Sequence, residues 1–314
     1  MKMKTKPLFR IMTLIMSVMM LFSCISSEKT EENDIAIQIN PLSAASNSAV
    51  KQVTVYYKYS YTDMLIGYSR ALAIPVNERI EFTVLNDLIK GRILNRSEYV
   101  QLINNNTEII SITDSGDTLN ITLSKEFLDF ENDEGDLNVN KRLAIYSIVN
   151  TMIEVSGYSR VQILIDKDDS GKGERMTLSE AGFESEGFLE PLGYNADIIL
   201  TPENTVKTIF DAMTRKDFEE LYYHIAYYDE NNTEKIDESV FVSRMYEQLP
   251  SFEAYTLHNC IVSNDGQTAY VLADYNLRFS GEIMEYINIP VKIVKENDIW
   301  KIQFSRFEAL FLGL

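Results

Sequence analysis

The stretch from Ala144 to Asp166 constrains the fold more than any other part of the chain. Four apolar residues recur at i, i+3, i+4 and i+7, the spacing of one helix face: Ile145, Ile148, Val149 and Met152. Gly157 stands where such a helix would end. Three apolar residues then alternate along a predicted strand: Val161, Ile163 and Ile165. A helix that leads through a short turn into a buried strand forms one packed α/β unit.

The length and charge of the chain limit the remaining possibilities. Its 314 residues are enough for two domains of average size. A hydrophobic content of 45% and a charged content of 24% are typical of a globular protein. The formal net charge of −18 argues against nucleic acid as a partner, because phosphate binding depends on Lys and Arg. The same charge disfavours adsorption to anionic lipid, so a link to a membrane must come from another feature.

The first 24 residues supply such a feature. Basic residues precede an apolar run from Ile11 to Phe22, which is too short to cross a bilayer and fits a signal peptide. The next residues, Leu21-Phe22-Ser23-Cys24, resemble a bacterial lipobox. This resemblance implies a lipoprotein signal peptide over residues 1–23 and a lipid on Cys24. It would anchor the protein to the outer face of the cytoplasmic membrane. The alternatives are an ordinary secretory signal with a chance cysteine, or a buried start of the chain.

Residues 24–50 are mostly polar, charged or small, and we predict a flexible tether there. The chain has one further cysteine, Cys260, so a lipidated Cys24 leaves no disulfide within the chain. Because apolar residues flank Cys260, we expect a small buried side chain and not a reactive thiol.

Residues 51–168 are predicted to form the first domain, with the element order β β α β β α β. Alternating runs begin near Val53 and Ala71, and a helical pattern from Phe82 ends before Gly91. A cluster of turn residues at 114–117 separates two alternating runs, which predicts a hairpin. Four tyrosines near the first strand are expected to pack mainly in the core: Tyr56, Tyr57, Tyr59 and Tyr61.

Several segments of this domain together resemble a known family. They are VTVYY, LAIPVNERI, VLNDLIKGR, TEIISI with DTLNITLSKEFL, and AIYSIVNTMIEVSGYSRVQILID. In this order they resemble the GerMN domain of the GerM sporulation and spore-germination lipoproteins, although one copy is evident here and GerM carries two. The resemblance implies an α/β sandwich similar to ring-building motifs, which work by protein contact. It also implies a Gram-positive host, a role in sporulation or germination, and a protein partner in the cell envelope.

Residues 169–200 contain many glycines and no clear periodicity, and we predict a linker or an extension. The second domain is predicted over residues 201–314. Thr201 and Pro202 fit the cap and first position of a helix, whose apolar face continues to Leu221. A second helix near 238–247 is followed by alternating strands, and Pro290 predicts an edge or a bulge. The whole chain is therefore predicted to be a two-domain α+β protein.

The second domain resembles the NTF2-like, cystatin-type cone. The resemblance rests on four segments: TPENTVKTIFDAMTRKDFEELYYHI, FVSRMYEQL, DGQTAYVLADYNL and VKIVKENDIWKI. It implies a sheet that curves around a helix and leaves a cleft. In that superfamily the cleft is sometimes catalytic and often only a binding or packing surface.

Two acidic segments could hold a metal ion. The residues from Asp166 to Gly171 are similar to the start of an EF-hand loop, but position twelve is Thr177 and a strand precedes the loop. The segment from Asp129 to Asp136 has no ligand spacing and is expected to be a solvated loop. We predict no metal and no cofactor.

The chain has two histidines, His224 and His258, and neither lies in a metal-binding spacing. His258 precedes Cys260 by two residues, so both side chains are expected on one face of a strand. Such neighbours rarely form the hydrogen bond that activates a nucleophile. We predict no catalytic residue and expect that the protein is not an enzyme.

The leading hypothesis is a lipid-anchored, non-enzymatic assembly or interaction module in sporulation or spore germination. The alternative is a cell-envelope lipoprotein that binds a ligand in the NTF2-like cleft, with the GerMN unit as a spacer. An apolar cleft with a few convergent polar groups would favour ligand binding. A broad exposed strand or helix face would favour the interaction module.

Overall fold

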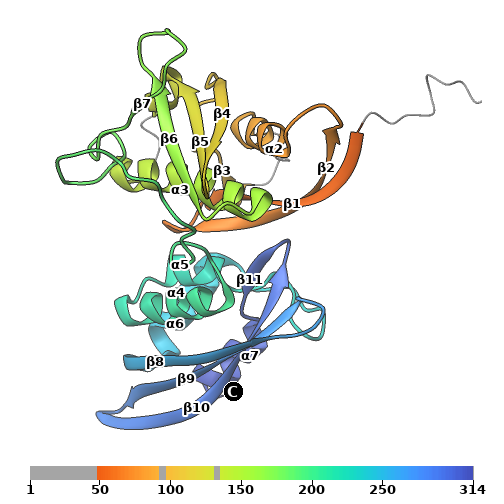
Figure 1. The fold of residues 1–314 in the computed structure, drawn as a ribbon. Helices are drawn as coiled ribbons and strands as arrows, with labels where there is room; N and C mark the ends of the chain where they lie inside the picture. Colours follow the sequence, from red (N-terminus) through yellow and green to blue (C-terminus); the bar gives the residue numbers. More distant parts are fainter. Residues whose placement is uncertain (1–47, 92–96, 131–134, 314) are drawn as a thin grey trace, which may run out of the picture. The chain divides into compact units, whose positions relative to one another are not determined.

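The computed structural model describes residues 48–91, 97–130 and 135–313, which contain two large hydrophobic cores and two smaller clusters (Figure 1). The predicted signal peptide, Cys24 and the tether up to residue 47 lie outside the described residues. The tether was expected to reach residue 50, but β1 begins at Ser48, because residues 48–50 pair with residues 73–75. Among the described residues, no helix has the length and apolar character needed to cross a membrane.

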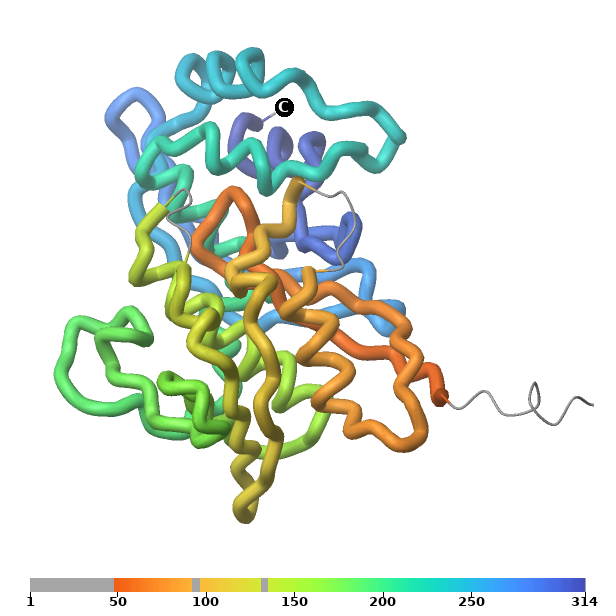
Figure 2. Tube along the Cα trace, turned by 90° about the horizontal axis from the view of Figure 1, so that it is seen from above, coloured from red at the N-terminus to blue at the C-terminus, as the bar shows by residue number. Residues whose placement is uncertain are grey.

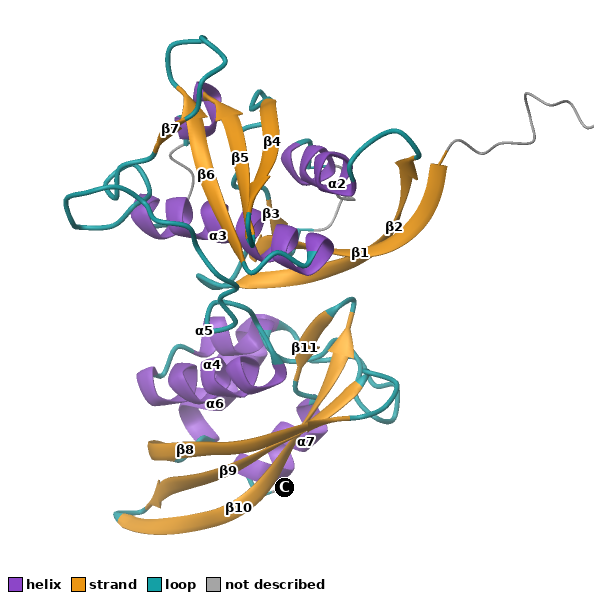
Figure 3. Ribbon diagram, in the orientation of Figure 1, coloured by secondary structure: helices purple, strands orange, loops and turns teal. Residues whose placement is uncertain are grey.

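The N-terminal domain contains two sheets (Figure 3). The first has the order β2-β1-β3, with these bounds: β1 Ser48–Tyr59, β2 Leu65–Pro75 and β3 Tyr99–Val100. The second has the order β4-β5-β6-β7: β4 Ile109–Ser115, β5 Thr118–Ser124, β6 Arg160–Asp166 and β7 Glu174–Arg175. Strands β5 and β6 are parallel, and the other neighbours are antiparallel. A parallel pair needs a crossover connection, which here includes helix α3.

The helices of this domain pack between strands of both sheets. Helix α2 (Ile80–Ile89) contacts β1, β2 and β4, and helix α3 (Leu137–Ser156) contacts β1 and β6. A short 3₁₀ helix, η1 (Lys125–Leu128), follows β5. Helix α3 ends at Gly157, which has the left-handed φ of 75° that glycine adopts without strain. The predicted order of elements is confirmed, with β3 as an additional short strand.

The helix and strand that organise the sequence also organise the core. The predicted apolar face of α3 is fully buried, at 0% exposure: Ile145, Ile148, Val149 and Met152. The alternating residues of β6 are also buried: Val161, Ile163 and Ile165. All seven side chains belong to one hydrophobic cluster, so this unit is the centre of the N-terminal domain.

Residues 169–200 pack on the N-terminal domain. Met176, Ala181 and Leu189 are buried in its core, and Leu192 exchanges two backbone hydrogen bonds with Val161. At Gly173 the backbone approaches the sheet so closely that an added Cβ would lie 2.7 Å from Leu164 Cβ. The segment is therefore an extension of the domain's core and not a bare connection.

The C-terminal domain has one antiparallel sheet and four helices. The sheet has the order β11-β10-β9-β8: β8 Ser251–Val262, β9 Thr268–Phe279, β10 Glu282–Glu296 and β11 Ile299–Lys301. The helices are α4 Pro202–Arg215, α5 Phe218–Tyr223, α6 Glu238–Gln248 and α7 Phe304–Phe311. The predicted bulge near Pro290 is confirmed, because the register shifts between Tyr286 and Ile289. The two-domain α+β prediction is also confirmed.

One predicted helix of this domain is wrong in length. The sequence favours a single helix from Pro202 to beyond Leu221, whereas the chain breaks it at Lys216, where φ is 60°. Asp217 then caps α5, because its side chain accepts a hydrogen bond from the N–H of Glu220 at 3.0 Å. The cap therefore starts a second helix, α5.

Aromatic rings fill the core of the C-terminal domain. Phe210 of α4 lies 5.8 Å from Tyr275 of β9 and 5.7 Å from Phe311 of α7, between ring centroids. All three side chains are at most 2% exposed. Helix α7, which the sequence interpretation missed, supplies Phe307 and Phe311 to this cluster.

Candidate functional site

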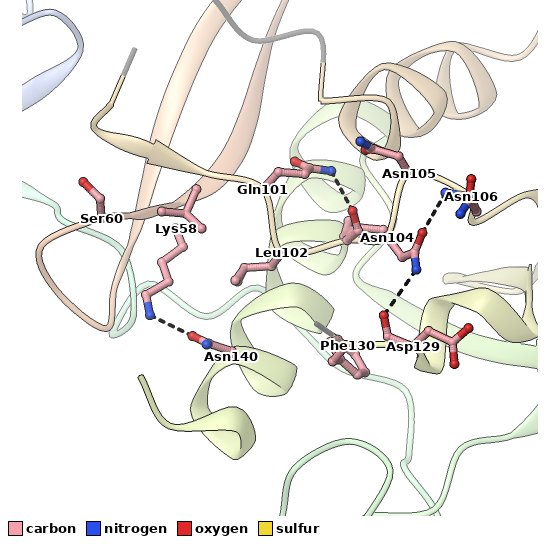
Figure 4. Close-up of a pocket in the computed structure, with 12 residues that line it drawn as sticks. Lys58, Ser60, Gln101, Leu102, Asn104, Asn105, Asn106, Asp129, Phe130 and Asn140 are labelled. Carbon is pink, nitrogen blue, oxygen red and sulfur yellow. Dashed lines mark hydrogen bonds between the residues drawn. The ribbon is translucent and has the colours of Figure 1, made fainter. Parts of the chain in front are cut away.

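A pocket of about 690 Å³ lies in the N-terminal domain (Figure 4). Its volume is in the range of small-molecule sites. Four parts of the chain line it: Lys58 and Ser60 at the end of β1, residues 100–106 from β3 onward, Asp129 and Phe130 after η1, and Asn140 of α3. These parts meet because β1 and α3 both contribute to the same domain core.

Lys58 forms the cationic part of the pocket wall. Its Nζ donates to Asn140 Oδ1 at 2.7 Å and lies 3.0 Å from Asp63 Oδ1. The lysine side chain is 8% exposed, whereas that of Asp63 is 57% exposed. A buried charge must be paired to be tolerated, and these two partners fulfil that need. The ammonium group is therefore committed to the protein and contributes little free positive charge to a ligand.

Amide side chains shape the opposite wall. Gln101 Nε2 donates to the carbonyl groups of Leu88 and Ile89 at 2.9 and 3.0 Å. These carbonyls lie at the end of α2, where they have no hydrogen-bond donor within the helix. Asn104 Oδ1 accepts a hydrogen bond from the N–H of Asn106 at 2.9 Å, and its Nδ2 donates to the carbonyl of Asp129 at 3.4 Å. Figure 4 shows the contacts of Asn104 with Asn106 and Asp129. The amides thus hold the segment after β3 against the residues after η1.

Amide side chains dominate the polar part of the pocket wall. The described lining residues include one carboxylate, that of Asp129, and no histidine or cysteine. Nucleophilic catalysis usually places a base within hydrogen-bond reach of the nucleophile. Amides, hydroxyls and the Phe130 ring instead suit an uncharged polar ligand or the main chain of another protein.

The structure separates His258 from Cys260. A β-bulge between Leu257 and Cys260 inserts an extra residue into β8 and reverses the alternation of faces. His258 Nε2 consequently lies 2.9 Å from Asp274 Oδ2, while Cys260 packs against the core. The expectation that both side chains share a face is therefore wrong. Burial also raises the pKa of the Cys260 thiol, which lowers its reactivity.

Asp274 joins two bulges on neighbouring strands. Besides His258 it contacts Asn288, whose backbone N–H donates to Asp274 Oδ1 at 2.7 Å. Asn288 has a φ of 54° within the bulge of β10. The hydrogen bond from Asn288 and then the His258 contact hold the pKa of the Asp274 carboxyl below its usual value. The contact between His258 and Asp274 thus fits a structural role in the sheet.

His224 is fully buried at the end of α5, and its two ring nitrogens have no hydrogen-bond partner among the described residues. Burial, and next the charge of Lys301, lower the pKa of the imidazole from 6.5 to about 3. The ring is therefore neutral at physiological pH. In the part of the chain that the structure describes, no three His, Cys, Asp or Glu residues are placed to hold a metal ion.

The loop that is similar to an EF-hand closes on itself. Asp166 accepts hydrogen bonds from the N–H groups of Ser170 and Gly171, at 3.0 and 2.8 Å. Its two oxygens thereby stabilise the turn. In the second acidic segment, the backbone of Asp129 contacts Asn104, Asp136 caps α3, and residues 131–134 lie outside the description.

Sequence interpretation missed the pocket residues. The contact between Lys58 and Asn140 joins positions that are 82 residues apart, and nothing local indicates it. Two weak signals are present: a lysine in the otherwise apolar run VTVYYKY, and three consecutive asparagines at 104–106.

The sequence of the N-terminal domain matches a known family. Residues 54–169 match the family Germane, described as sporulation and spore germination. Over these residues the chain is similar to that family. The match covers less than half of the chain, and it includes the pocket and the helix–strand unit at the centre of the core. No curated protein matches the chain.

Solved structures provide three further comparisons. The tandem GerMN domains of the sporulation protein GerM from Bacillus subtilis align with 16% identity and a TM-score of 0.34, over 48% of this chain and 47% of that chain. The alignment thus spans about half of the GerM structure. A Clostridium perfringens protein named as a lipoprotein aligns with 18% identity and a TM-score of 0.27, over 48% and 91%. A Shewanella putrefaciens protein named as a SnoaL-like polyketide cyclase aligns with 12% identity and a TM-score of 0.23, over 39% and 97%.

Proposed function

We propose that this chain is a lipid-anchored, non-enzymatic interaction module of the cell envelope that acts in sporulation or spore germination. The observation that carries the proposal is the Germane match over residues 54–169. The chemistry of the described residues supports it. The polar groups that could have served catalysis, such as His258 and Asp274, contact one another and the backbone of the sheet.

The aromatic packing of the C-terminal domain bears on the alternative function. A ligand in the NTF2-like cleft would need space inside the cone, where Phe210, Tyr275 and Phe311 are packed at centroid distances of 5.3 to 5.8 Å. The N-terminal pocket, by contrast, has an open volume and a polar wall. We therefore assign contact with a protein partner to the N-terminal domain and a supporting role to the C-terminal domain.

The proposed lipid anchor is supported by the N-terminal sequence. An apolar run of signal-peptide length before Leu21-Phe22-Ser23-Cys24 supports lipidation at Cys24 and attachment to the outer face of the cytoplasmic membrane. We expect Cys24→Ala to release the protein from the membrane pellet after a high-salt wash. The control Cys260→Ala should remain attached. Tight retention of the Cys24→Ala protein would contradict the anchor.

The role itself is tested by deletion and complementation. Cells that lack the protein should form fewer heat-resistant spores or germinate more slowly, and the wild-type chain should restore both. The variants His258→Asn and Cys260→Ser should restore them equally, since the proposal gives these residues no chemical step. Normal sporulation and germination in the deletion strain would contradict the role. A folded His258→Asn protein without function would contradict the non-enzymatic assignment.

A further inference from the structure

The outer edge of β2 carries backbone groups that are open to another strand. In β2, the N–H and carbonyl of Leu65 bond to Ile198 and Leu200 and therefore point away from β1. Backbone groups alternate between the two sides of a strand, so the same direction applies to Gly67, Ser69, Ala71 and Ala73. The neighbouring strand β1 supports this alternation. Tyr56 is the β1 residue paired with Gly67, and its backbone N–H points away from β2 and donates to Thr151.

Among the described residues, the edge from Gly67 to Ala73 has no lysine, proline or bulge, although Arg70 is directed inward and Pro75 ends the strand. The four residues with outward backbone groups have small, uncharged side chains: Gly67, Ser69, Ala71 and Ala73. On the same face, β1 presents uncharged Val50, Gln52 and Thr54 opposite three of them. Natural proteins protect such edges with lysine, proline or a bulge, or cover them. The register of β2 with β1 is unbroken from Leu65 to Pro75.

The chain itself already adds a strand to this edge. Residues 198–200 pair with Leu65 in a parallel bridge and then leave the sheet to enter α4. Beyond that bridge, the red to orange end of the ribbon extends away from α3 and the β4–β7 sheet in both views (Figure 2). The remaining edge offers seven residues, from Gly67 to Ala73, for further pairing.

Charge indicates which occupant fits. The chain has a net charge of −18, so two copies can approach closely only where carboxylates are absent. The one charged residue of β2, Arg70, faces inward, where its Nη1 lies 3.0 Å from Asp87. In an antiparallel pair centred on Ala71, Arg70 of one copy lies opposite Leu72 of the other, and Ser69 lies opposite Ala73. No like charges meet in this register.

We propose that the β2 edge pairs with the same edge of a second copy, in an antiparallel arrangement centred on Ala71. The inference deepens the proposed interaction function by naming one partner, a second copy of this chain. Such a contact is isologous and closes as a dimer, which removes the open edge from both copies. It adds main-chain hydrogen bonds between the two edges.

Sedimentation equilibrium of the compact unit from Asn47 onward tests this dimer. At concentrations up to about 300 μM, the wild-type mass should rise from monomer to dimer and no further, as a closed contact requires. Ala71→Pro removes an outward N–H and blocks the edge, at a position where proline is tolerated. Ala71→Lys keeps the N–H but places two ammonium groups opposite each other at the symmetry axis. Both variants should lose the dimer, and each should melt within a few degrees of the wild type.

Gln52→Lys is the matched control. Gln52 lies opposite Ala71 on β1, on the same face but one strand away from the edge, so this variant should still dimerise. A monomeric wild type, or a dimer that survives in Ala71→Pro and Ala71→Lys, would overturn the proposal. Loss of the dimer in Gln52→Lys as well would indicate docking on the face and not the edge. Spore phenotypes are read separately, so failure of the dimer and failure of the proposed function are distinguishable.

Discussion

The imidazole of His224 makes the stability of the C-terminal domain depend on pH. In the folded protein its pKa is about 3, because the ring is fully buried and has no hydrogen-bond partner among the described residues. In the unfolded chain its pKa is near 6.5. Between these values the unfolded state binds more protons than the folded state. The free energy of unfolding therefore falls as the pH falls from 6.5 toward 3.

We expect this group to account for a loss of roughly 2 kcal/mol between pH 7.5 and pH 5, at about 1.4 kcal/mol for each pH unit below 6.5. For His224→Leu, the free energy of unfolding should decrease less over the same pH range. The remaining decrease comes from the other titratable groups. Urea unfolding of both proteins at the two pH values measures the difference. Equal losses in both would show that His224 takes up a proton in the folded state.

Ile148 tests the centre of the N-terminal core. It is 0% exposed on α3, so Ile148→Asp buries an unpaired carboxylate at a cost of several kcal/mol. That cost is comparable to a total stability of about 5–15 kcal/mol, and we expect the N-terminal domain to unfold. The control Ile148→Val should lower the free energy of unfolding by only about 1 kcal/mol. Circular dichroism melts compare them, and a native melt for Ile148→Asp would refute the assigned core.

Local signals explain which single residues were predictable. Gly157 and the pair Thr201–Pro202 end or begin helices through their own backbone preferences, and the structure confirms them. The partners of Lys58 and His258 are set by tertiary packing and by a bulge. No short-range pattern in the sequence encodes those contacts.

At the scale of elements, the break between α4 and α5 shows that a helix can end although its hydrophobic spacing continues, when a capping residue starts a new helix. The apolar spacing continues from Ile209 to Leu221, yet Lys216 adopts a φ of 60° and Asp217 caps a new helix. Asp217→Ala should lower the free energy of unfolding by about 1 kcal/mol, the usual effect of losing a cap. Glu219→Gln, an exposed change in the same turn, is the control. Equal unfolding free energies for Asp217→Ala and the wild type would show that the cap does not stabilise α5.

The extension after β6 shows that a segment can belong to the core although its sequence has no hydrophobic periodicity. Its residues have no regular spacing, but Leu189 and Met176 share a backbone hydrogen bond and both are buried in the core. We therefore expect the backbone amide of Leu189 to exchange with solvent as slowly as those of β6. Hydrogen–deuterium exchange measures this, with the amide of exposed Asn264, in the turn between β8 and β9, as the fast control. Rapid exchange at Leu189 would restore the interpretation as a flexible linker.

At the scale of the whole molecule, the two cores were predictable and their surfaces were not. Hydrophobic periodicity indicated both domains, because each core is built from long regular elements such as α3, β6 and α4. The pocket and the open edge of β2 depend on tertiary contacts between segments that are far apart in the sequence. The sequence therefore predicted the fold class well and the candidate binding surfaces poorly.

Site-specific photo-crosslinking in sporulating cells tests most directly whether the chain works by protein contact through its N-terminal domain. A photoreactive amino acid would replace exposed residues one at a time: Ala73, Phe82 and Ile110 in the N-terminal domain, and Tyr246, Ile261 and Ile287 in the C-terminal domain. We predict specific protein adducts from at least one N-terminal position and none from the C-terminal positions. Adducts only from the C-terminal domain, or from neither domain, would contradict the account.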